Sequence, residues 1–160
     1  MKTNIYIFLL IIVLPLFGCN NKSKEFTVEL YLKSNSPTDI QIFYCAGYFE
    51  DYSEENSHIK SLKENKPSVL AYVFQVEKTP KRLRIDFNTS EEISLEIDSL
   101  KIISNNVEYI VKSKRIEDLF SFNSQVEGHF NDDKLTLKTI KTNEVYDPYI
   151  ITKNLFKYLY

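Results

Sequence analysis

The chain has 160 residues, of which 43% are hydrophobic and 26% are charged, and its formal net charge is -2. This length suits one domain. The nearly balanced charge gives no excess of basic residues that would indicate nucleic-acid binding. Three glycines and five prolines exclude collagen-like and Gly-rich linker classes, and two cysteines cannot build a disulfide scaffold.

The first 18 residues have the pattern of an export signal. A short, positively charged start at 1–4 precedes a nearly unbroken apolar run at 5–17. A helix of about 13 residues rises only ~20 Å, which is too short for a bilayer core of ~30 Å. The run therefore predicts the hydrophobic region of a secretory signal peptide. An ordinary signal peptide that happens to contain a cysteine and an uncleaved anchor are the alternatives.

The apolar run ends in Leu16-Phe17-Gly18-Cys19, which resembles the lipobox of bacterial lipoproteins. The resemblance implies that the Cys19 thiol receives a diacylglyceryl group and that the peptide is cut before it. Residues 1–18 would then be the signal peptide and 19–25 the lipidated cysteine with a polar tether. Asn20 is not the aspartate that retains lipoproteins in the inner membrane of enterobacteria. In a Gram-negative host we therefore expect attachment to the outer membrane. The tether lacks the closely spaced acidic residues of known surface-export signals, so we expect the domain to face the periplasm.

Residues 26–160 predict a single all-β domain, an antiparallel β-sandwich with one or two short helices. Short segments in which apolar and polar residues alternate are typical of half-buried strands. Tyr, Phe, Ile and Val are enriched, which favours strands. The strands predicted along the chain lie at 26–32, 40–45, 69–76, 83–87, 93–97, 100–103, 107–111 and 135–140.

Several of these segments carry a more specific prediction. The run 69–76 is apolar apart from Gln75, which predicts a central strand, and Ser104-Asn105-Asn106 predicts a hairpin turn. The polar stretch 47–67 predicts a long loop with at most a short helical turn. Residues 115–122 predict a short amphipathic helix, and residues 149–160 predict a helix or a terminal strand.

Two stretches of the body carry a second resemblance. They are Gln41-Ile42-Phe43-Tyr44-x-x-Gly47-x-Phe49-x-x-x-Ser53 and Leu83-Arg84-Ile85-Asp86, together with the following strand that ends in Ile97-Asp98-Ser99-Leu100-Lys101-Ile102 and with Asp147-Pro148. They resemble the extracytoplasmic β-sandwich module found beside bacterial membrane glycosyltransferases. The resemblance implies a jelly-roll, galactose-binding-like fold and a carbohydrate ligand. In that module a proline follows the Leu-Arg-Ile-Asp segment and a tryptophan lies near the first one, whereas this chain has Phe87 and no Trp.

Sugar binding needs exposed aromatic faces and planar hydrogen-bonding groups. Tyr48 and Tyr52 lie on the polar loop, where we expect them to be exposed, and Arg84 and Asp86 lie on the polar side of one strand. These four residues are the candidate ligand contacts. The alternative is that the nearby aromatic residues fill the core and that Arg84 pairs with Asp86 or with a neighbouring carboxylate.

Other site chemistries have weak support in the sequence. No nucleophile elbow, phosphate-cradling loop or His-Glu-x-x-His motif occurs, so enzyme activity and a cofactor are not expected. Oxygen ligands for calcium occur at 131–133 and at Asp51, Glu54 and Glu55, where a solvated turn is the alternative. Cys45 is expected to be a small buried side chain.

The sequence thus predicts an envelope lipoprotein, held at a membrane through Cys19, that acts as a non-catalytic binding module. A glycan or glycolipid is the expected ligand. The alternative is a structural, accessory or inhibitor lipoprotein that binds another envelope protein, and an enzyme is the third reading.

Overall fold

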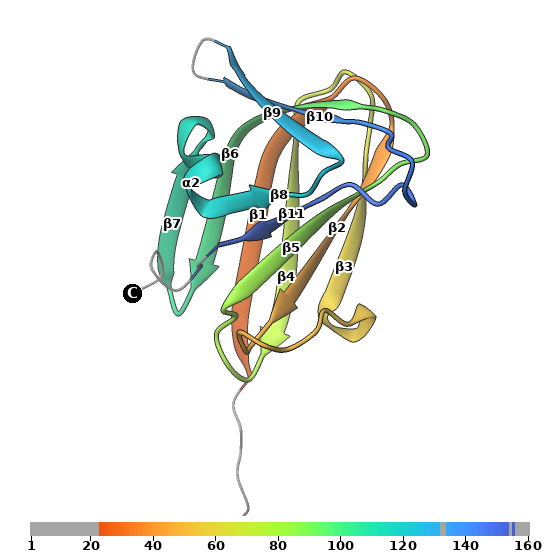
Figure 1. The fold of residues 1–160 in the computed structure, drawn as a ribbon. Coiled ribbons are helices and arrows are strands. Elements are labelled where there is room, and N and C mark those ends of the chain that lie inside the picture. The colour runs from red at the N-terminus through yellow and green to blue at the C-terminus, as the bar shows by residue number, and fades with distance from the viewer. Residues whose placement is uncertain (1–22, 132–133, 154, 156–160) are drawn as a thin grey trace, which may run out of the picture.

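The computed structural model describes residues 23–131, 134–153 and 155, which form two antiparallel β-sheets packed face to face (Figure 1). We name them sheet A, with the spatial order β4-β1-β6-β10-β9 and β7 also paired to β6, and sheet B, with the order β3-β2-β5-β11-β8. The strands of sheet A are β1 (Lys24–Ser34), β4 (Ser68–Val76), β6 (Ser94–Ser104), β7 (Val107–Lys112), β9 (Val126–Asn131) and β10 (Lys134–Thr139). The strands of sheet B are β2 (Thr38–Cys45), β3 (Ser57–Leu62), β5 (Arg82–Asn88), β8 (Phe120–Phe122) and β11 (Tyr149–Thr152). The prediction of an all-β sandwich is confirmed.

The core lies between the sheets because successive side chains of a strand point to opposite faces. In β1, Phe26, Val28, Leu30 and Leu32 are buried in the core. Tyr72 on β4 is also fully buried, and its hydroxyl donates a hydrogen bond of 2.8 Å to the carbonyl of Ile40 on β2. Burial raises the pKa of Tyr72. This hydrogen bond satisfies the phenol and joins the two sheets.

Sheet A branches on β6. The first part of β6, up to Ile97, pairs with β10, and the part from Ser99 onward pairs with β7. On the other side of β6, Leu32 of β1 pairs with Ile97 and Tyr31 pairs with Ser99. Asp98 is therefore the extra residue of a β-bulge, and it lies where the outer partner of β6 changes from one strand to another.

Ser113 bridges the gap that this branching opens. Its buried hydroxyl donates a hydrogen bond of 2.5 Å to the carbonyl of Ile97 and accepts one of 2.8 Å from the backbone N–H of Leu135 on β10. Ser113 begins the 3-10 turn η3 (Ser113–Arg115), which follows β7 and leads into the short helix α2 (Ile116–Leu119). One side chain thus satisfies two backbone groups that a further strand would otherwise have to satisfy.

The predicted hairpin between β6 and β7 is confirmed. Ser104 pairs with Val107, and the two residues of the turn, Asn105 and Asn106, have φ angles of 51° and 63°. A two-residue turn with positive φ at both positions matches the twist of the strands, and asparagine tolerates this conformation.

Two of the predictions between residues 47 and 76 are wrong. The second half of the predicted loop contains the 3-10 turn η2 (Glu54–Asn56) and the strand β3, in which only Leu62 is buried, so no apolar alternation marks it. The apolar run 69–76 forms β4, which lies at the edge of sheet A and pairs only with β1 among the described residues. Val69 and Val73 of this strand face solvent.

Three further differences lie in the second half of the chain. The strands predicted at 93–97 and 100–103 are one strand, β6, because the bulge at Asp98 continues it across a break in the alternation. The helix predicted at 115–122 is confined to α2 and followed by β8, while β9 was not predicted at all. The terminal segment begins with the strand β11, and residues 154 and 156–160 lie outside the described residues.

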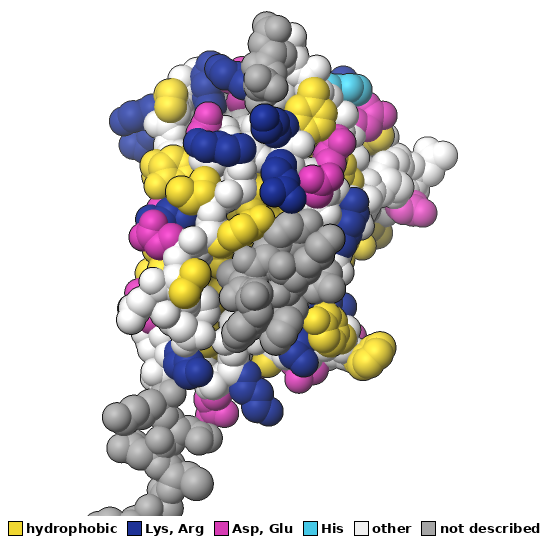
Figure 2. Space-filling model, turned by 90° about the vertical axis from the view of Figure 1, so that its left-hand side faces the viewer, with side chains coloured by type: hydrophobic (Ala, Val, Ile, Leu, Met, Phe, Trp, Pro, Cys, Tyr) yellow, Lys and Arg dark blue, Asp and Glu magenta, His cyan; other side chains and the backbone are white. Residues whose placement is uncertain are grey.

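The side of the sandwich along β7 and α2 mixes charges of both signs. Lys and Arg side chains alternate there with Asp and Glu and with scattered hydrophobic side chains (Figure 2). This distribution agrees with the near-neutral composition of the chain.

Replacing Ser113 tests the bridge on β6. The Ser113→Ala variant leaves the carbonyl of Ile97 and the N–H of Leu135 without their partner, and we expect the free energy of unfolding to fall by about 2–3 kcal/mol. Urea unfolding measures this change. The control is Ser121→Ala, which removes an exposed hydroxyl of β8 and should change the free energy by less than about 0.5 kcal/mol. Equal effects of the two substitutions would contradict the bridging role of Ser113.

Candidate functional site

Of the two cysteines, the structure describes only the free thiol, Cys45. Cys19 lies outside the described residues. Cys45 on β2 is buried, as predicted, and its Sγ–H donates to the carbonyls of Glu50 (3.6 Å) and Asp51 (3.4 Å). Burial raises the pKa of Cys45, which disfavours the reactive thiolate. Within the described ranges, no helix is both long and apolar enough to cross a membrane.

The outer face of sheet B brings three of the four predicted ligand contacts together. Arg84 and Asp86 lie on this face of β5, and Phe43 of β2 pairs with Arg84 in register. Tyr52, on the loop after β2, packs edge-on against Phe43 with ring centroids 6.3 Å apart. Tyr48 lies elsewhere, at one end of the sandwich, with the ammonium of Lys81 4.8 Å from its ring centroid.

Arg84 is held by two carboxylates and an aromatic ring. Its guanidinium binds both oxygens of Asp86, at 2.6 and 2.7 Å, and reaches Asp147 at 2.9 Å. It also lies 4.0 Å from the ring centroid of Tyr149 on β11. The side chain of Asp86 is only 8% exposed and that of Arg84 only 22%. The predicted alternative, in which Arg84 pairs with Asp86, is thus what the structure contains.

The environment of Asp86 sets its protonation. Burial raises the pKa of its carboxyl, and the hydrogen-bonded guanidinium of Arg84 opposes that shift. Gln41, directly opposite Asp86 on β2, donates to Glu54 at 2.7 Å and to Ser57 at 2.9 Å. Asn88 in turn donates to Gln41 at 3.0 Å. The polar groups of this face therefore hydrogen-bond mainly to one another.

Tyr52 is less exposed than its position on a polar loop predicts. Its ring lies between Phe43 and the guanidinium of Arg82, which is 5.1 Å from the ring centroid. Its buried hydroxyl has no hydrogen-bond partner among the described residues, and burial raises its pKa to about 12. Tyr48, in contrast, is exposed, as predicted.

The candidate calcium ligands do not assemble in the described part of the chain. No cluster of three or more His, Cys, Asp or Glu side chains within it has the geometry to hold a metal ion. Asp132 and Asp133 lie outside the described residues.

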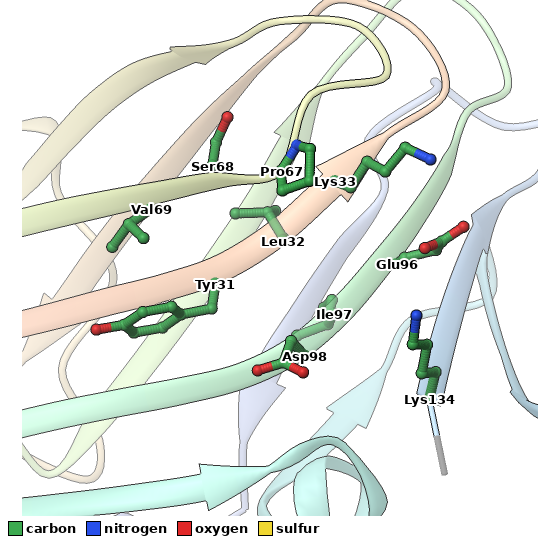
Figure 3. A pocket seen from close by; sticks show the side chains of 10 residues that line it. All are labelled: Tyr31, Leu32, Lys33, Pro67, Ser68, Val69, Glu96, Ile97, Asp98 and Lys134. Atoms are coloured by element: carbon green, nitrogen blue, oxygen red, sulfur yellow. The ribbon is translucent and has the colours of Figure 1, made fainter. Parts of the chain in front are cut away.

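A groove crosses the outer face of sheet A, at residues that the sequence did not point to as a site. It has a volume of about 400 Å³ and runs across β4, β1, β6 and the start of β10 (Figure 3). Its apolar lining comes from Tyr31, Leu32, Pro67, Val69 and Ile97, and its polar lining from Lys33, Ser68, Glu96, Asp98 and Lys134.

The bulge on β6 explains why a groove forms there. Asp98 lies at the branch point, where neither β10 nor β7 pairs with β6, so the outer surface of sheet A is interrupted. In Figure 3, Tyr31 and Asp98 project from neighbouring strands into one half of the groove, while Lys134 points toward Glu96 in the other half.

An ionic network below the groove fixes the ring of Tyr31. Its hydroxyl donates a hydrogen bond of 2.8 Å to Glu29, and this bond raises the pKa of the phenol. Lys101 lies 3.9 Å from Glu29 and 3.0 Å from Glu108 on β7. The groove therefore combines one oriented aromatic ring, an apolar floor and charged groups of both signs.

Sequence reasoning missed this site because its residues come from four strands. Tyr31 and Lys33 are only the polar positions of an alternating strand, and Pro67 ends a predicted loop. The one available signal was Asp98-Ser99, the pair that interrupts the alternation of β6. A bulge near a sheet edge is a frequent neighbour of binding sites.

Comparison of the chain with protein-family models, with curated proteins and with solved structures finds no match.

The Arg84 network yields a test of its structural role. We expect Arg84→Met to lower the free energy of unfolding by about 2 kcal/mol near neutral pH, because it leaves the buried carboxylate of Asp86 unpaired. Without the guanidinium the pKa of Asp86 rises further, so the variant recovers stability relative to the wild type as pH falls and this carboxyl becomes protonated. Urea unfolding at about pH 7 and about pH 4.5 measures both effects.

The control for this prediction is Arg115→Met, which removes an exposed ion pair with Asp118. Exposed pairs contribute about 0–1 kcal/mol, so this variant should change little at either pH. A loss at Arg84 that is small, or that does not shrink at the lower pH, would contradict the buried pairing.

Proposed function

We propose that this chain is a lipid-anchored protein of the bacterial envelope whose β-sandwich is a non-catalytic module that binds a glycan or the sugar part of a glycolipid. The anchor is the diacylglyceryl group implied by the lipobox at Cys19, and an outer-membrane position facing the periplasm is part of the proposal. The groove on sheet A is the observation that best supports a sugar as the ligand.

The chemistry of the groove suits a pyranose ring. Sugars present a C–H face that packs on an aromatic ring and a rim of hydroxyl groups that hydrogen-bond to carboxylates and ammonium groups. The groove offers the ring of Tyr31 and the carboxylate of Asp98 in one half and the ammonium of Lys134 in the other half (Figure 3). Its volume of about 400 Å³ lies within the range of small-molecule sites.

The outer face of sheet B supports the same ligand less well. Arg84 and Asp86 already hydrogen-bond to each other. The guanidinium of Arg84 also hydrogen-bonds to Asp147 and lies against the ring of Tyr149. A sugar would have to replace these bonds rather than add to them, and unpairing buried groups costs free energy. The resemblance to the module beside glycosyltransferases agrees with a sugar ligand but does not choose between the two faces.

A second candidate function is binding of another envelope protein, and the edge strand β4 favours it. Its nine residues, Ser68–Val76, contain no charged side chain, although exposed edges are commonly protected by charges or prolines. Val69 and Val73 face solvent beside its unpaired backbone. An extended segment of a partner could add to this edge as a further strand.

The groove is tested by glycan binding. A glycan array probed with the protein identifies a ligand, and Tyr31→Ala should then weaken binding of that ligand by at least about tenfold, a loss of ~1.4 kcal/mol. Asp98→Asn should weaken it as well, whereas Tyr31→Phe keeps the ring and should retain more affinity. Titration calorimetry with the glycan identified by the array measures each affinity.

The matched control is Tyr48→Ala, which removes the exposed tyrosine that the sequence predicted as a contact. If Tyr48→Ala abolishes binding and Tyr31→Ala does not, the ligand binds away from the groove. An array without any hit, combined with a crosslinked protein partner that is lost in Val73→Lys, would favour the second candidate function.

The anchor is tested independently of the ligand. Cells that express the wild-type chain and are fed radiolabelled palmitate should incorporate label into it, whereas Cys19→Ala should remain unlabelled. Cys45→Ala should label like the wild type, because that thiol is buried. Continued labelling of Cys19→Ala would contradict lipidation at this residue.

A further inference from the structure

The described chain begins at one end of the sandwich, which we call the N-terminal end. Lys24, at the start of β1, pairs with Val76, so the loop 77–81 follows directly beside it. Cys45 pairs with Arg82 across the same level, which brings the loop 46–53 to the same end. A shallow depression lined by residues of both loops, among them Glu50 and Lys78, confirms that they are neighbours. In Figure 1 the start of β1 and both loops lie at the bottom of the view.

This end exposes an aromatic pair. Tyr48 is 41% exposed, and Phe49 beside it is completely exposed. A fully exposed phenylalanine on a surface turn gains nothing from folding, since its apolar surface stays in water. Val107, after the hairpin turn of β6 and β7, is a further exposed apolar side chain at this end.

The turn that carries Phe49 is held in place from several sides. The backbone N–H of Gly47 donates a hydrogen bond of 2.8 Å to the carboxylate of Glu50. The carbonyl of Glu50 accepts from the guanidinium of Arg82 and from the thiol of Cys45. Across the turn, the ammonium of Lys81 lies against the ring of Tyr48. The contacts fix the turn while leaving Phe49 pointing away from the domain.

The N-terminal end is not marked by an excess of charge of either sign. The four basic side chains at this end, Lys24, Lys78, Lys81 and Arg82, are matched by the four carboxylates of Glu25, Glu50, Asp51 and Glu77. The end therefore has no excess charge that would attract an anionic surface, and the aromatic pair is its distinguishing feature. Aromatic side chains are enriched where proteins meet the polar layer of a bilayer.

We propose that the N-terminal end rests against the bilayer, with Tyr48 and Phe49 inserted into its interfacial layer. The proposal rests on the lipid anchor at Cys19. Only four residues lie between Cys19 and Lys24, and the five residue-to-residue steps of an extended chain span at most ~17 Å. The anchor would therefore hold this end, and no other, within reach of the lipid headgroups.

The experiment uses the absence of tryptophan from the chain. The full-length Phe49→Trp variant, processed in a bacterial host and labelled with palmitate, is reconstituted into phosphatidylcholine vesicles. Its indole emission should shift to shorter wavelength and should be quenched by lipids brominated on the acyl chain. Because the contact is not driven by charge, raising the salt concentration should leave the quenching unchanged.

The matched control is Val145→Trp. Val145 is 88% exposed and lies in the loop before β11, where the neighbouring Tyr146 hydroxyl donates a hydrogen bond of 3.1 Å to the carbonyl of Glu91. Glu91 precedes β6, and the start of β6 pairs with the far end of β1. This loop thus lies at the opposite end of the sandwich, and its indole should show neither the shift nor the quenching.

The outcomes separate the two proposals. Quenching of the Phe49→Trp variant alone supports docking through the N-terminal end. If both variants are palmitate-labelled and bound to vesicles but are quenched equally or not at all, docking through this end is wrong while the anchor stands. If neither variant carries label, the anchor and the docking proposal fail together.

Discussion

The branch point of β6 is the constraint on which the architecture of sheet A depends. One strand of 11 residues pairs with β1 along one edge and with both β10 and β7 along the other. Two strands cannot meet end to end without leaving backbone groups unsatisfied, and a buried unsatisfied group costs about 1–3 kcal/mol. The bulge at Asp98 and the hydroxyl of Ser113 resolve this conflict from opposite sides of the strand. The groove is the surface consequence, because the same interruption that Ser113 bridges in the interior leaves a hollow outside.

The polar residues on the two outer faces of the sandwich differ in how far they are paired with one another and buried. On sheet B, Arg84 and Asp86 bind each other and are largely removed from water, so their charges organise β5 and β11 rather than remaining available. On sheet A, Glu29 and Lys101 orient Tyr31 from below, while the carboxylate of Asp98 and the ammonium of Lys134 line the groove. A binding site needs oriented polar groups that can still hydrogen-bond to a ligand, and this requirement is why the proposed ligand site lies on sheet A rather than on sheet B.

The sequence predicted those parts of the fold whose signal is local. Alternating apolar residues located β1 and β5, and two consecutive asparagines located the turn after β6, since both features depend on neighbouring residues alone. Position within a sheet is not local. An apolar run such as 69–76 is compatible with a central strand and with an edge strand, because one face is buried in either case and nothing in the run says whether a neighbour covers the other edge. The edge strand β3, with one buried side chain, has no apolar pattern to detect.

The same distinction applies to the candidate site. The sequence predicted that Arg84 and Asp86 lie together, because residues two apart on a strand point to the same face of the sheet. The structure places both side chains on one face of β5. Whether such a pair is free for a ligand depends on Asp147 and Tyr149, which are more than 60 residues further along the chain. The groove is non-local in the same way, since it joins side chains from β1, β4, β6 and β10.

The proposed membrane contact and the proposed ligand groove are geometrically compatible. β1 runs from the N-terminal end at Lys24 to Ser34, and a strand rises about 3.3 Å per residue. Tyr31 and Lys33 of the groove therefore lie roughly 23–30 Å along the strand from its start. A domain that stands on Tyr48 and Phe49 with its strands inclined away from the bilayer holds the groove on its side, beyond the headgroup layer. Free glycans could then enter the groove without displacing the domain from the membrane, whereas the sugar of a glycolipid in the same leaflet could reach it only if its glycan extends over that distance. The length of the bound glycan is thus tied to the orientation of the sandwich, because a domain lying flat on sheet A would bury the groove that it needs for binding.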